Sequence, residues 1–253
     1  MISVVILGTG NMAQHLCQTF SKTDSIQLIQ VYGRNQGNLR WFFSYAELCS
    51  EPKDIAKADV YLIAVSDQAI EEVSGHLLDK KGIVAHTSGA TPMNILSAEN
   101  RGVFYPLQTF TKDKTVDFDS IPICLEAQNE ESLGVLQDLA QAISSKVHLI
   151  NTEQRRQLHL AAVFTNNFTN YLYGIGEAIC KRNKISFDLL KPLIQETSNK
   201  IMSLPPKEAQ TGPARRGDEK SMNQHLSLMS DRTEQEIYRL LSKAIKTTYE
   251  KEL

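Results

Sequence analysis

Short apolar runs rich in β-branched residues alternate with amphipathic stretches over the first 150 residues. Seven runs have the length and composition of strands: 2–7, 27–32, 60–65, 82–86, 102–105, 121–125 and 146–150. Between several of them the apolar residues follow helical spacing, at 11–22, 67–79, 91–98 and 130–144. Nearly continuous apolar strands separated by helices are typical of a parallel sheet that is covered on both faces. The pattern predicts a doubly wound α/β domain over residues 1–150.

The pattern changes after Asn151. Residues 152–183 carry no strand signal and predict one long helix with apolar residues on more than one face, and further helices are predicted at 187–203, 219–230 and 232–252. The segment 204–218 contains three prolines and two glycines and predicts a loop. A smaller all-helical domain is therefore expected over 151–253. Its apolar faces exceed what one helical bundle buries, which favours a homodimer formed through this domain.

The composition of the chain limits the kinds of molecule that it is expected to bind. The chain of 253 residues has a formal net charge of −2, which gives no sign of binding to nucleic acid or to an acidic membrane surface. No apolar run approaches the roughly eighteen residues of a membrane span, and the first twenty residues lack the features of a signal peptide. The four cysteines form no CxxC pair, so neither structural zinc nor disulfides are expected. A cytoplasmic protein that binds a small molecule fits best.

The first strand runs into the sequence GTGNMA. Its glycines and small residue have the spacing of a dinucleotide-binding turn, and the turn has the required context of a preceding strand and a following helix. The predicted cofactor-binding residues of this turn are Gly8, Gly10, Asn11, Met12 and Ala13. The alternative is a plain bend between strand and helix. Six further strands behind it favour the binding site.

The end of the second strand bears on which dinucleotide is bound. NAD-binding sites usually place Asp or Glu there, on the ribose 2′-hydroxyl, whereas this strand ends in Tyr32 and is followed by Gly33 and Arg34. A guanidinium at this point can pair with a 2′-phosphate, so Arg34 favours NADP(H) over NAD(H). A solvated arginine in a turn is the alternative interpretation.

Polar residues also follow the third and fourth predicted strands. Val65 and Ser66 stand where the ribose and nicotinamide would pass, while the adjacent Asp67 serves equally well as a helix cap. The sequence HTSGA follows the next strand, and Ser88 is a candidate for the floor of the active cleft. For Ser88 a role in the turn is an equal alternative. Thr91 is expected to cap a helix over 91–98.

Two further candidate sets lie in the helical half. His159, Asn166 and Asn170 have the spacing that places them on one helix face, where they would meet a polar substrate or act as satisfied core polar groups. The sequence TGPARRGD contains Arg216 and Asp218, and an arginine in such a loop would hold a carboxylate on the substrate. An exposed basic linker is the alternative.

Several of these motifs together resemble a known family. The sequences GTGNMA, AVSD, HTSGA, YPLQTF (105–110), HLAAVFTNNF (159–168) and TGPARRGD (211–218) look like the Rossmann-like and DUF2520 domain-containing proteins. That family is assigned to the NADP oxidoreductases and is related to pyrroline-5-carboxylate reductase and, more distantly, to β-hydroxyacid dehydrogenases. The resemblance implies an NADP-binding domain and a helical domain that pairs in a homodimer. It supplies no substrate.

The chain departs from its relatives at two points. β-Hydroxyacid dehydrogenases carry a catalytic lysine three to four residues before an asparagine pair, and this chain has Val163 and Ala162 there. That argues against hydroxyacid oxidation by their mechanism. The segment ending in PLQTF often begins with His in the family, whereas Tyr105 stands here and could still donate a proton.

The sequence thus predicts an NADP(H)-dependent oxidoreductase that moves hydride to or from a small C=N or C=O substrate. In this interpretation Ser88, His159 and Asn166 position the substrate or supply a proton, and Arg216 holds an acidic group on it. The alternative is a non-catalytic dimer that binds or senses NADP(H).

Overall fold

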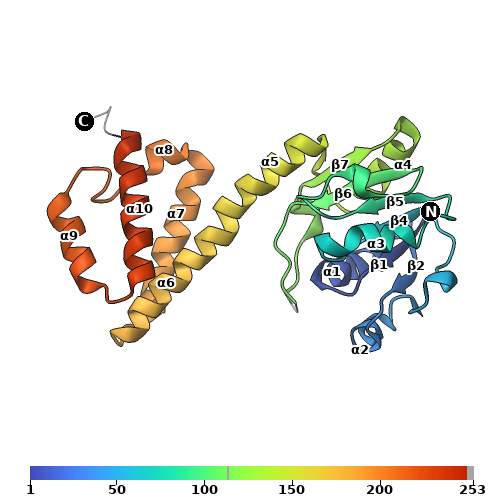
Figure 1. The fold of residues 1–253 in the computed structure, drawn as a ribbon, viewed down its shortest axis with the longest axis horizontal. Coiled ribbons are helices and arrows are strands. Elements are labelled where there is room, and N and C mark those ends of the chain that lie inside the picture. The colour runs from blue at the N-terminus through green and yellow to red at the C-terminus, as the bar shows by residue number, and fades with distance from the viewer. Residues whose placement is uncertain (113, 250–253) are drawn as a thin grey trace. The chain divides into compact units, whose positions relative to one another are not determined.

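A computed structural model describes residues 1–112 and 114–249. Contacts within the chain divide it into two compact units, Met1–Phe164 and Thr165–Leu253, both drawn in Figure 1. The sequence pattern places the domain boundary after residue 150, and the contacts assign the helix that follows to the first unit.

The described part of the first unit contains one eight-stranded sheet. Its strands are β1 (Ile2–Leu7), β2 (Ile26–Tyr32), β3 (Glu47–Cys49), β4 (Val60–Ile63), β5 (Ile83–His86), β6 (Arg101–Pro106), β7 (Ile123–Ala127) and β8 (Val147–Leu149). They are ordered β3-β2-β1-β4-β5-β6-β7-β8. Each of the seven predicted runs overlaps a strand, and the predicted fold class is confirmed. The short strand β3 was not predicted, because its three residues show no apolar run.

Most strands of the sheet run in the same direction. The strands from β3 to β6 pair in parallel, β7 pairs antiparallel with β6, and β8 pairs parallel with β7. The carboxyl ends of β1, β2, β4, β5 and β6 therefore lie along one edge of the sheet. In doubly wound sheets this is the edge at which ligands bind.

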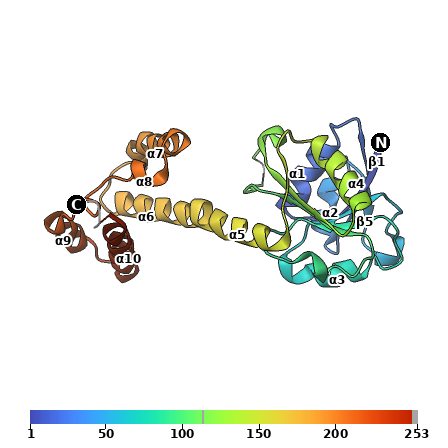
Figure 2. The same ribbon diagram turned by 90° about the horizontal axis from the view of Figure 1, so that it is seen from above.

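Alternating side chains of each strand bury the two faces of the sheet. Val4 and Ile6 of β1 belong to one core cluster with apolar residues of α1 (Asn11–Phe20) and α4 (Glu130–Gln141). Val5 and Leu7 point to the other face, where they cluster with α3 (Ile70–Gly75). Figure 2 shows these layers, with α1 and α4 on one side of the sheet and α3 on the other. Both faces are covered, which explains the nearly continuous apolar strands.

The remaining helices of the first unit are short, apart from α5. They are α2 (Gln36–Leu39), the 3₁₀ turns η1 (Arg40–Phe42), η2 (Pro52–Asp54), η3 (Asp67–Ala69), η4 (Met93–Ile95) and η5 (Phe118–Ser120), and α5 (Thr152–Ala162). A π-helical segment, Val163–Phe168, follows α5 directly. The predicted long helix over 152–183 is thus helical throughout its described length to Arg182, with a change of winding near its middle.

The predicted helix over 91–98 is wrong. Only the single turn η4 forms there, and Pro92 before it has an extended backbone. The Ser88 hydroxyl accepts hydrogen bonds from the N–H groups of Ala90 and Thr91. The Ser88 hydroxyl therefore caps a turn, and no side chain caps a helix here. The apolar spacing that suggested a helix comes instead from Leu96 and Ala98, which are buried in the second core cluster.

The second unit is helical. It contains α6 (Thr169–Arg182), η7 (Phe187–Leu190), α7 (Lys191–Ser203), α8 (Pro206–Ala209), α9 (Glu219–Leu228) and α10 (Arg232–Tyr249). Arg182 pairs bidentately with Glu234, at 2.6 Å and 3.0 Å, and so joins α6 to α10. The predicted helices over 187–203 and 219–230 are confirmed, and so is the one over 232–252 as far as Tyr249; residues 250–252 lie outside the described residues. The short helix α8 interrupts the predicted loop over 204–218.

The two glycines of the first turn have different structural reasons to be glycine. Gly8 has φ +131°, and a Cβ at this position would lie 2.2 Å from the carbonyl oxygen of Ala64. Gly10 has an extended backbone, and a Cβ there would meet no atom within 4 Å. Gly8 is therefore required by the fold, whereas the space over Gly10 is open.

We expect Gly8→Ala to lower the free energy of unfolding by about 3 kcal/mol or more, because it combines a strained backbone with a clash against β4. Gly10→Ala should cost about 1 kcal/mol or less, since the position is a tolerant helix cap. Urea unfolding followed by circular dichroism measures both values. Equal losses in the two variants would show that the close approach of Gly8 to Ala64 does not matter.

Candidate functional site

The candidate site lies in the first unit, along the edge where the parallel strands end. The glycine turn follows β1, Val65 and Ser66 follow β4, and the HTSGA loop follows β5. Tyr105 is the penultimate residue of β6. The sheet therefore brings together four motifs that lie almost a hundred residues apart in the sequence.

The glycine turn presents the free N-terminus of α1. Gly10 is the N-cap, no side chain caps the helix, and its first turn carries no acidic residue. The first N–H groups of such a helix are unsatisfied and point along the positive end of its dipole, which suits an anion such as a pyrophosphate. Ala13 is fully buried between α1 and the sheet. The turn therefore fits a dinucleotide, and Ala13 allows the close contact of helix and strand.

The loop after β6 packs on the same helix. Asn11 donates a hydrogen bond from Nδ2 to the carbonyl oxygen of Phe110, at 3.0 Å. The His15 Nε2 lies 3.0 Å from the carbonyl oxygen of Thr111, and its ring packs against that of Phe110. Met12 packs against the core below. These contacts give the end of the YPLQTF motif a structural role beside the cofactor turn.

Arg34 follows β2 and lies near the glycine turn. A Cβ on Gly33 would be 2.5 Å from the Thr9 Cγ2, so the chain after β2 lies directly against the turn. The Arg34 guanidinium is exposed and forms a 3.0 Å ion pair with Glu72 on α3. Asn35 caps α2 through its side chain. The place of Arg34 is the one expected of a group that contacts a 2′-phosphate, and its pairing with Glu72 was not predicted.

Val65 and Ser66 lie where the sequence places them, after β4. The Val65 Cγ1 would be 3.2 Å from a Cβ on Gly8, so this side chain borders the glycine turn. Ser66 is exposed, and its side chain makes no capping hydrogen bond to η3. Their contact with a cofactor stays a prediction.

Tyr105 and His159 form the polar centre of the edge. The Tyr105 hydroxyl lies 3.1 Å from the His159 Nδ1, and the two rings meet edge to face. A Cβ on Gly89 would lie 2.6 Å from both the His159 Nδ1 and the Tyr105 Cζ. Only glycine leaves room for this pair. The hydrogen bond thus joins the YPLQTF motif to the long helix, and the HTSGA loop packs against both through Gly89.

The environment keeps Tyr105 protonated. Burial raises the pKa of Tyr105 to about 12; Cys124 and Asp67 act in the same direction, and the Arg155 guanidinium opposes them. The hydroxyl is therefore a proton donor over the whole neutral range.

The HTSGA loop contributes mainly to its own structure. Ser88 donates a hydrogen bond from its hydroxyl to the Thr91 Oγ1, besides accepting from the two backbone N–H groups. His86 is fully buried, and its Nδ1 accepts from the N–H of Ser88. Burial, followed by the charge of Arg155, lowers the pKa of His86 to about 4. His86 is therefore neutral, and the catalytic role of Ser88 stays a prediction.

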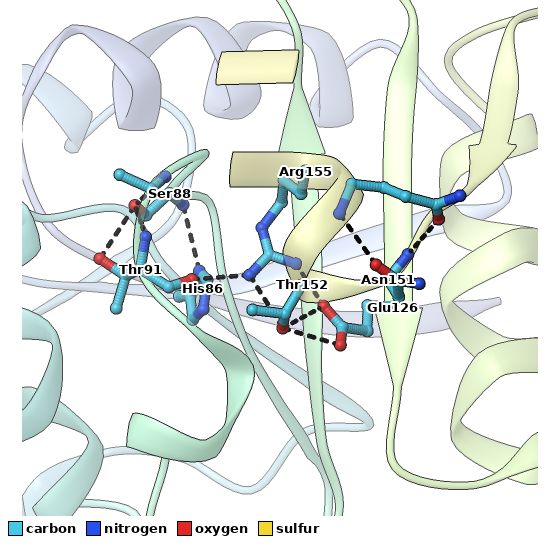
Figure 3. Close-up of polar contacts among 9 residues, drawn as sticks. His86, Ser88, Thr91, Glu126, Asn151, Thr152 and Arg155 are labelled. Carbon is cyan, nitrogen blue, oxygen red and sulfur yellow. Dashed lines mark hydrogen bonds and ion pairs between the residues drawn. The ribbon is translucent and has the colours of Figure 1, made fainter. Parts of the chain in front are cut away.

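Sequence reasoning missed Arg155, the buried charge that holds this edge together (Figure 3). Its side chain is fully buried, forms an ion pair with Glu126 of β7 and donates from Nη2 to the Thr91 carbonyl oxygen, at 2.6 Å. Thr152, one turn earlier on α5, donates its hydroxyl to the same carboxylate, at 2.8 Å. The available signal was the spacing: Arg155 precedes His159 by four residues, which puts both on one helix face.

The other predicted site residues belong to the second unit. Asn166 lies in the π-helical segment and is exposed, as is Asn170. These side chains therefore need no buried partner, contrary to the interpretation of the stripe as buried. Arg216 is exposed, and Asp218 caps α9 through the N–H and hydroxyl of Ser221. Asp218 thus has a structural task, and the roles of Asn166 and Arg216 stay predictions.

Comparisons with known proteins agree with this geometry. Residues 3–89 match the family described as NADP oxidoreductase coenzyme F420-dependent, and residues 121–245 match the domain of unknown function DUF2520. The crystal structure of a "putative NADP oxidoreductase" from Bacteroides fragilis is 36% identical, has a TM-score of 0.91 and covers 97% of this chain and 98% of its own. This chain belongs to that family of NADP oxidoreductases. The resemblance drawn from the sequence motifs is confirmed.

More distant structures share the fold. An imine reductase from Myxococcus stipitatus in complex with NADP⁺ is 16% identical, with a TM-score of 0.61 over 98% of this chain and 93% of its own. A pyrroline carboxylate reductase from Plasmodium falciparum with NADP bound is 14% identical, with a TM-score of 0.59 over 97% and 98%. No curated protein matches the chain. The predictions of an oxidoreductase and of NADP as its cofactor are confirmed at the level of the family.

Two features of other protein classes are absent from the described residues. Among residues 1–112 and 114–249 no helix is long and apolar enough to cross a membrane. Within the same part of the chain no group of three or more His, Cys, Asp or Glu side chains could hold a metal ion.

We expect Arg155→Met to lower the free energy of unfolding by about 3–5 kcal/mol, because it leaves the Glu126 carboxylate without its partner in a largely buried place. Arg156→Met is the matched control: this neighbour is exposed, and its ion pair with Glu153 spans 3.9 Å, so its loss should cost less than about 1 kcal/mol. Urea unfolding measures both.

The double variant Arg155→Met/Glu126→Gln should be more stable than Arg155→Met, because it removes the orphaned charge. If Arg155→Met proved no more costly than the control, the buried pair would not be what secures α5 to the sheet.

Proposed function

We propose that the protein is an NADP(H)-dependent reductase that transfers hydride between the cofactor and a small C=N or C=O substrate, with Tyr105 as the proton donor. The observation that carries this proposal is the Tyr105–His159 hydrogen bond, which lies at the same edge of the sheet as a glycine turn with a free helix N-terminus. The imine reductase and the pyrroline carboxylate reductase that share the fold support the choice of C=N chemistry.

The chain's own residues would hold the cofactor as follows. The N–H groups at the start of α1 receive the pyrophosphate over the open space at Gly10, and Arg34 contacts the 2′-phosphate. Val65 and Ser66 border the ribose and the nicotinamide. When bound, the cofactor supplies or accepts the hydride.

The proton is handled by the pair of side chains at the centre of the edge. In the reducing direction the Tyr105 Oη donates its proton to the substrate nitrogen or oxygen as the hydride reaches the adjacent carbon. The His159 Nδ1, when it carries a proton, donates a hydrogen bond to the Tyr105 oxygen and stabilises the charge that develops there. Burial keeps Tyr105 protonated at neutral pH, so its hydroxyl carries the proton before the reaction begins.

Three predicted residues complete the proposal. Ser88 holds the loop that carries Gly89 against the pair. Asn166 and Arg216 are proposed to contact the substrate, Arg216 through a carboxylate, and both are exposed side chains. Binding of the substrate's acidic group by Arg216 would favour acidic cyclic imines.

The second unit favours a homodimer. Its buried hydrophobic residues in the described part of the chain are Cys180, Ala214, Met222 and Tyr249. Its exposed large hydrophobic residues are far more numerous: Phe168, Tyr171, Leu172, Tyr173, Ile185, Leu189, Leu193, Ile201, Met202, Leu204, Leu228, Leu240 and Leu241. So much exposed apolar surface marks an interface. All four cysteines are buried free thiols, which suits a cytoplasmic protein.

The central experiment titrates the purified protein with NADPH and then supplies pyrroline-5-carboxylate, other small imines, ketones and coenzyme F420, which the family description names. Turnover of at least one compound is expected. On that compound Tyr105→Phe should lower kcat by about 100-fold or more and leave NADPH binding unchanged, because it removes the donated proton.

Tyr45→Phe is the control for this experiment. Tyr45 stacks on Trp41, has no role in the proposed site, and its change to Phe should keep the activity of the wild type. Binding of NADPH without turnover of any compound would instead support a non-catalytic module that binds or senses the cofactor.

Light scattering should give the mass of two chains in solution. Leu193→Asp/Met202→Asp should shift the protein towards one chain, because it places charges on exposed apolar positions of α7, whereas Leu78→Asp, an equally apolar exposed position in the first unit, should not. A wild-type protein of one chain at all concentrations would contradict the dimer.

A further inference from the structure

Arg34, the residue proposed to contact the 2′-phosphate, already has an acidic partner in the structure. Its Nη1 lies 3.0 Å from the Glu72 Oε1. Glu72 stands in the first turn of α3, after β4, whereas Arg34 follows β2. Both side chains are well exposed, at 66% and 57%, so the pair is accessible to a ligand from solvent.

The pair is located where the end of a dinucleotide would lie. The N–H of Gly8 donates to the carbonyl oxygen of Tyr32, at 2.9 Å, which fixes the end of β2 beside the glycine turn. Gly33 then packs against Thr9. Arg34 is the next residue, and the carboxylate of Glu72 therefore stands at the same corner as the predicted 2′-phosphate.

Acidic groups gather at this corner. Burial raises the pKa of Tyr32, Arg34 opposes the shift, and Cys49, Glu51 and Glu72 add to it. The guanidinium is thus the positive group among the charges that act on Tyr32, and two carboxylates act against it. An isolated arginine would attract a phosphate more strongly than one in this setting.

We propose that Glu72 weakens the preference of the protein for NADP(H) over NAD(H) by competing with the 2′-phosphate for Arg34. The inference rests on the proposed function through the assignment of Arg34. A phosphate that approaches the guanidinium must displace a carboxylate or accept its repulsion, whereas a ribose 2′-hydroxyl meets neither cost. Glu72 therefore narrows the difference in affinity between the two cofactors.

The size of the effect follows from the exposure of the pair. Ion pairs between exposed side chains are weak, of the order of 1 kcal/mol or less, so the carboxylate is readily exchanged for a phosphate. Removing its charge should accordingly change affinity by about fivefold at most. The change should shrink at high ionic strength, since salt screens exposed charges.

The test compares Glu72→Gln with Glu71→Gln, a neighbouring exposed acid of the same helical turn. Dissociation constants for NADPH and NADH are measured by calorimetry at low and at high salt. Glu72→Gln should tighten NADPH about threefold to fivefold at low salt and change NADH less than twofold. Glu71→Gln should leave the ratio of the two constants within twofold of the wild type.

Arg34→Gln separates the inference from the function on which it rests. This variant should weaken the binding of NADPH much more than that of NADH. When Glu72→Gln is added to Arg34→Gln, it should tighten NADPH binding by at most half as much as it does in the wild-type protein. If Arg34→Gln changes the ratio but Glu72→Gln does not, or does so no more than Glu71→Gln, only the role of Glu72 is overturned. If Arg34→Gln weakens the binding of both cofactors equally, or if neither cofactor binds to the protein, the roles proposed for Arg34 and for Glu72 are both wrong.

Discussion

The candidate site depends on one buried charge, the Arg155 guanidinium. It lies on α5 and binds two parts of the first unit, the Glu126 carboxylate on β7 and the Thr91 carbonyl oxygen just after the HTSGA loop. A buried guanidinium cannot lose its charge, so its acceptors must stay within hydrogen-bond distance. The same helix carries His159 one turn later, and the same loop carries Gly89. Arg155 therefore links the helix that carries His159 to the loop that carries Gly89.

This charge also shapes the electrostatics of its neighbours. It disfavours a second positive charge on the buried His86, which stays neutral and accepts a hydrogen bond from the Ser88 N–H. It acts on Tyr105 in the opposite sense to burial, yet burial prevails and the hydroxyl remains protonated. The edge of the sheet thus combines one fixed cation with neutral donors. In such an arrangement Tyr105 can donate its proton to a substrate while the surrounding structure stays the same.

The sequence predicted the parts of the molecule that local patterns determine. The seven strands and the helices were visible because buried strands are continuously apolar, and the glycine turn was visible because Gly8 is imposed by a backbone clash. Contacts between distant residues were not visible. The Tyr105–His159 bond spans 54 positions, and the Arg34–Glu72 pair spans 38. The prediction of a helix over 91–98 was wrong for a related reason. The apolar spacing of Leu96 and Ala98 reflects their burial in the second core cluster, while the backbone N–H of Thr91 donates to the Ser88 hydroxyl and forms a turn.

The proton-donating pair and the corner proposed to bind the 2′-phosphate are held with very different strengths. The Tyr105–His159 pair is supported by a buried ion pair whose disruption costs several kcal/mol, on the order of 3–5. The Arg34–Glu72 pair is exposed and contributes at most about 1 kcal/mol. A substitution of Glu72 can change the preference for a cofactor with little effect on folding, whereas a substitution of Arg155 affects both the fold and the geometry of proton donation. Cofactor preference is therefore the property of this site that a single exposed residue can adjust, and the geometry of proton donation is the one that it cannot.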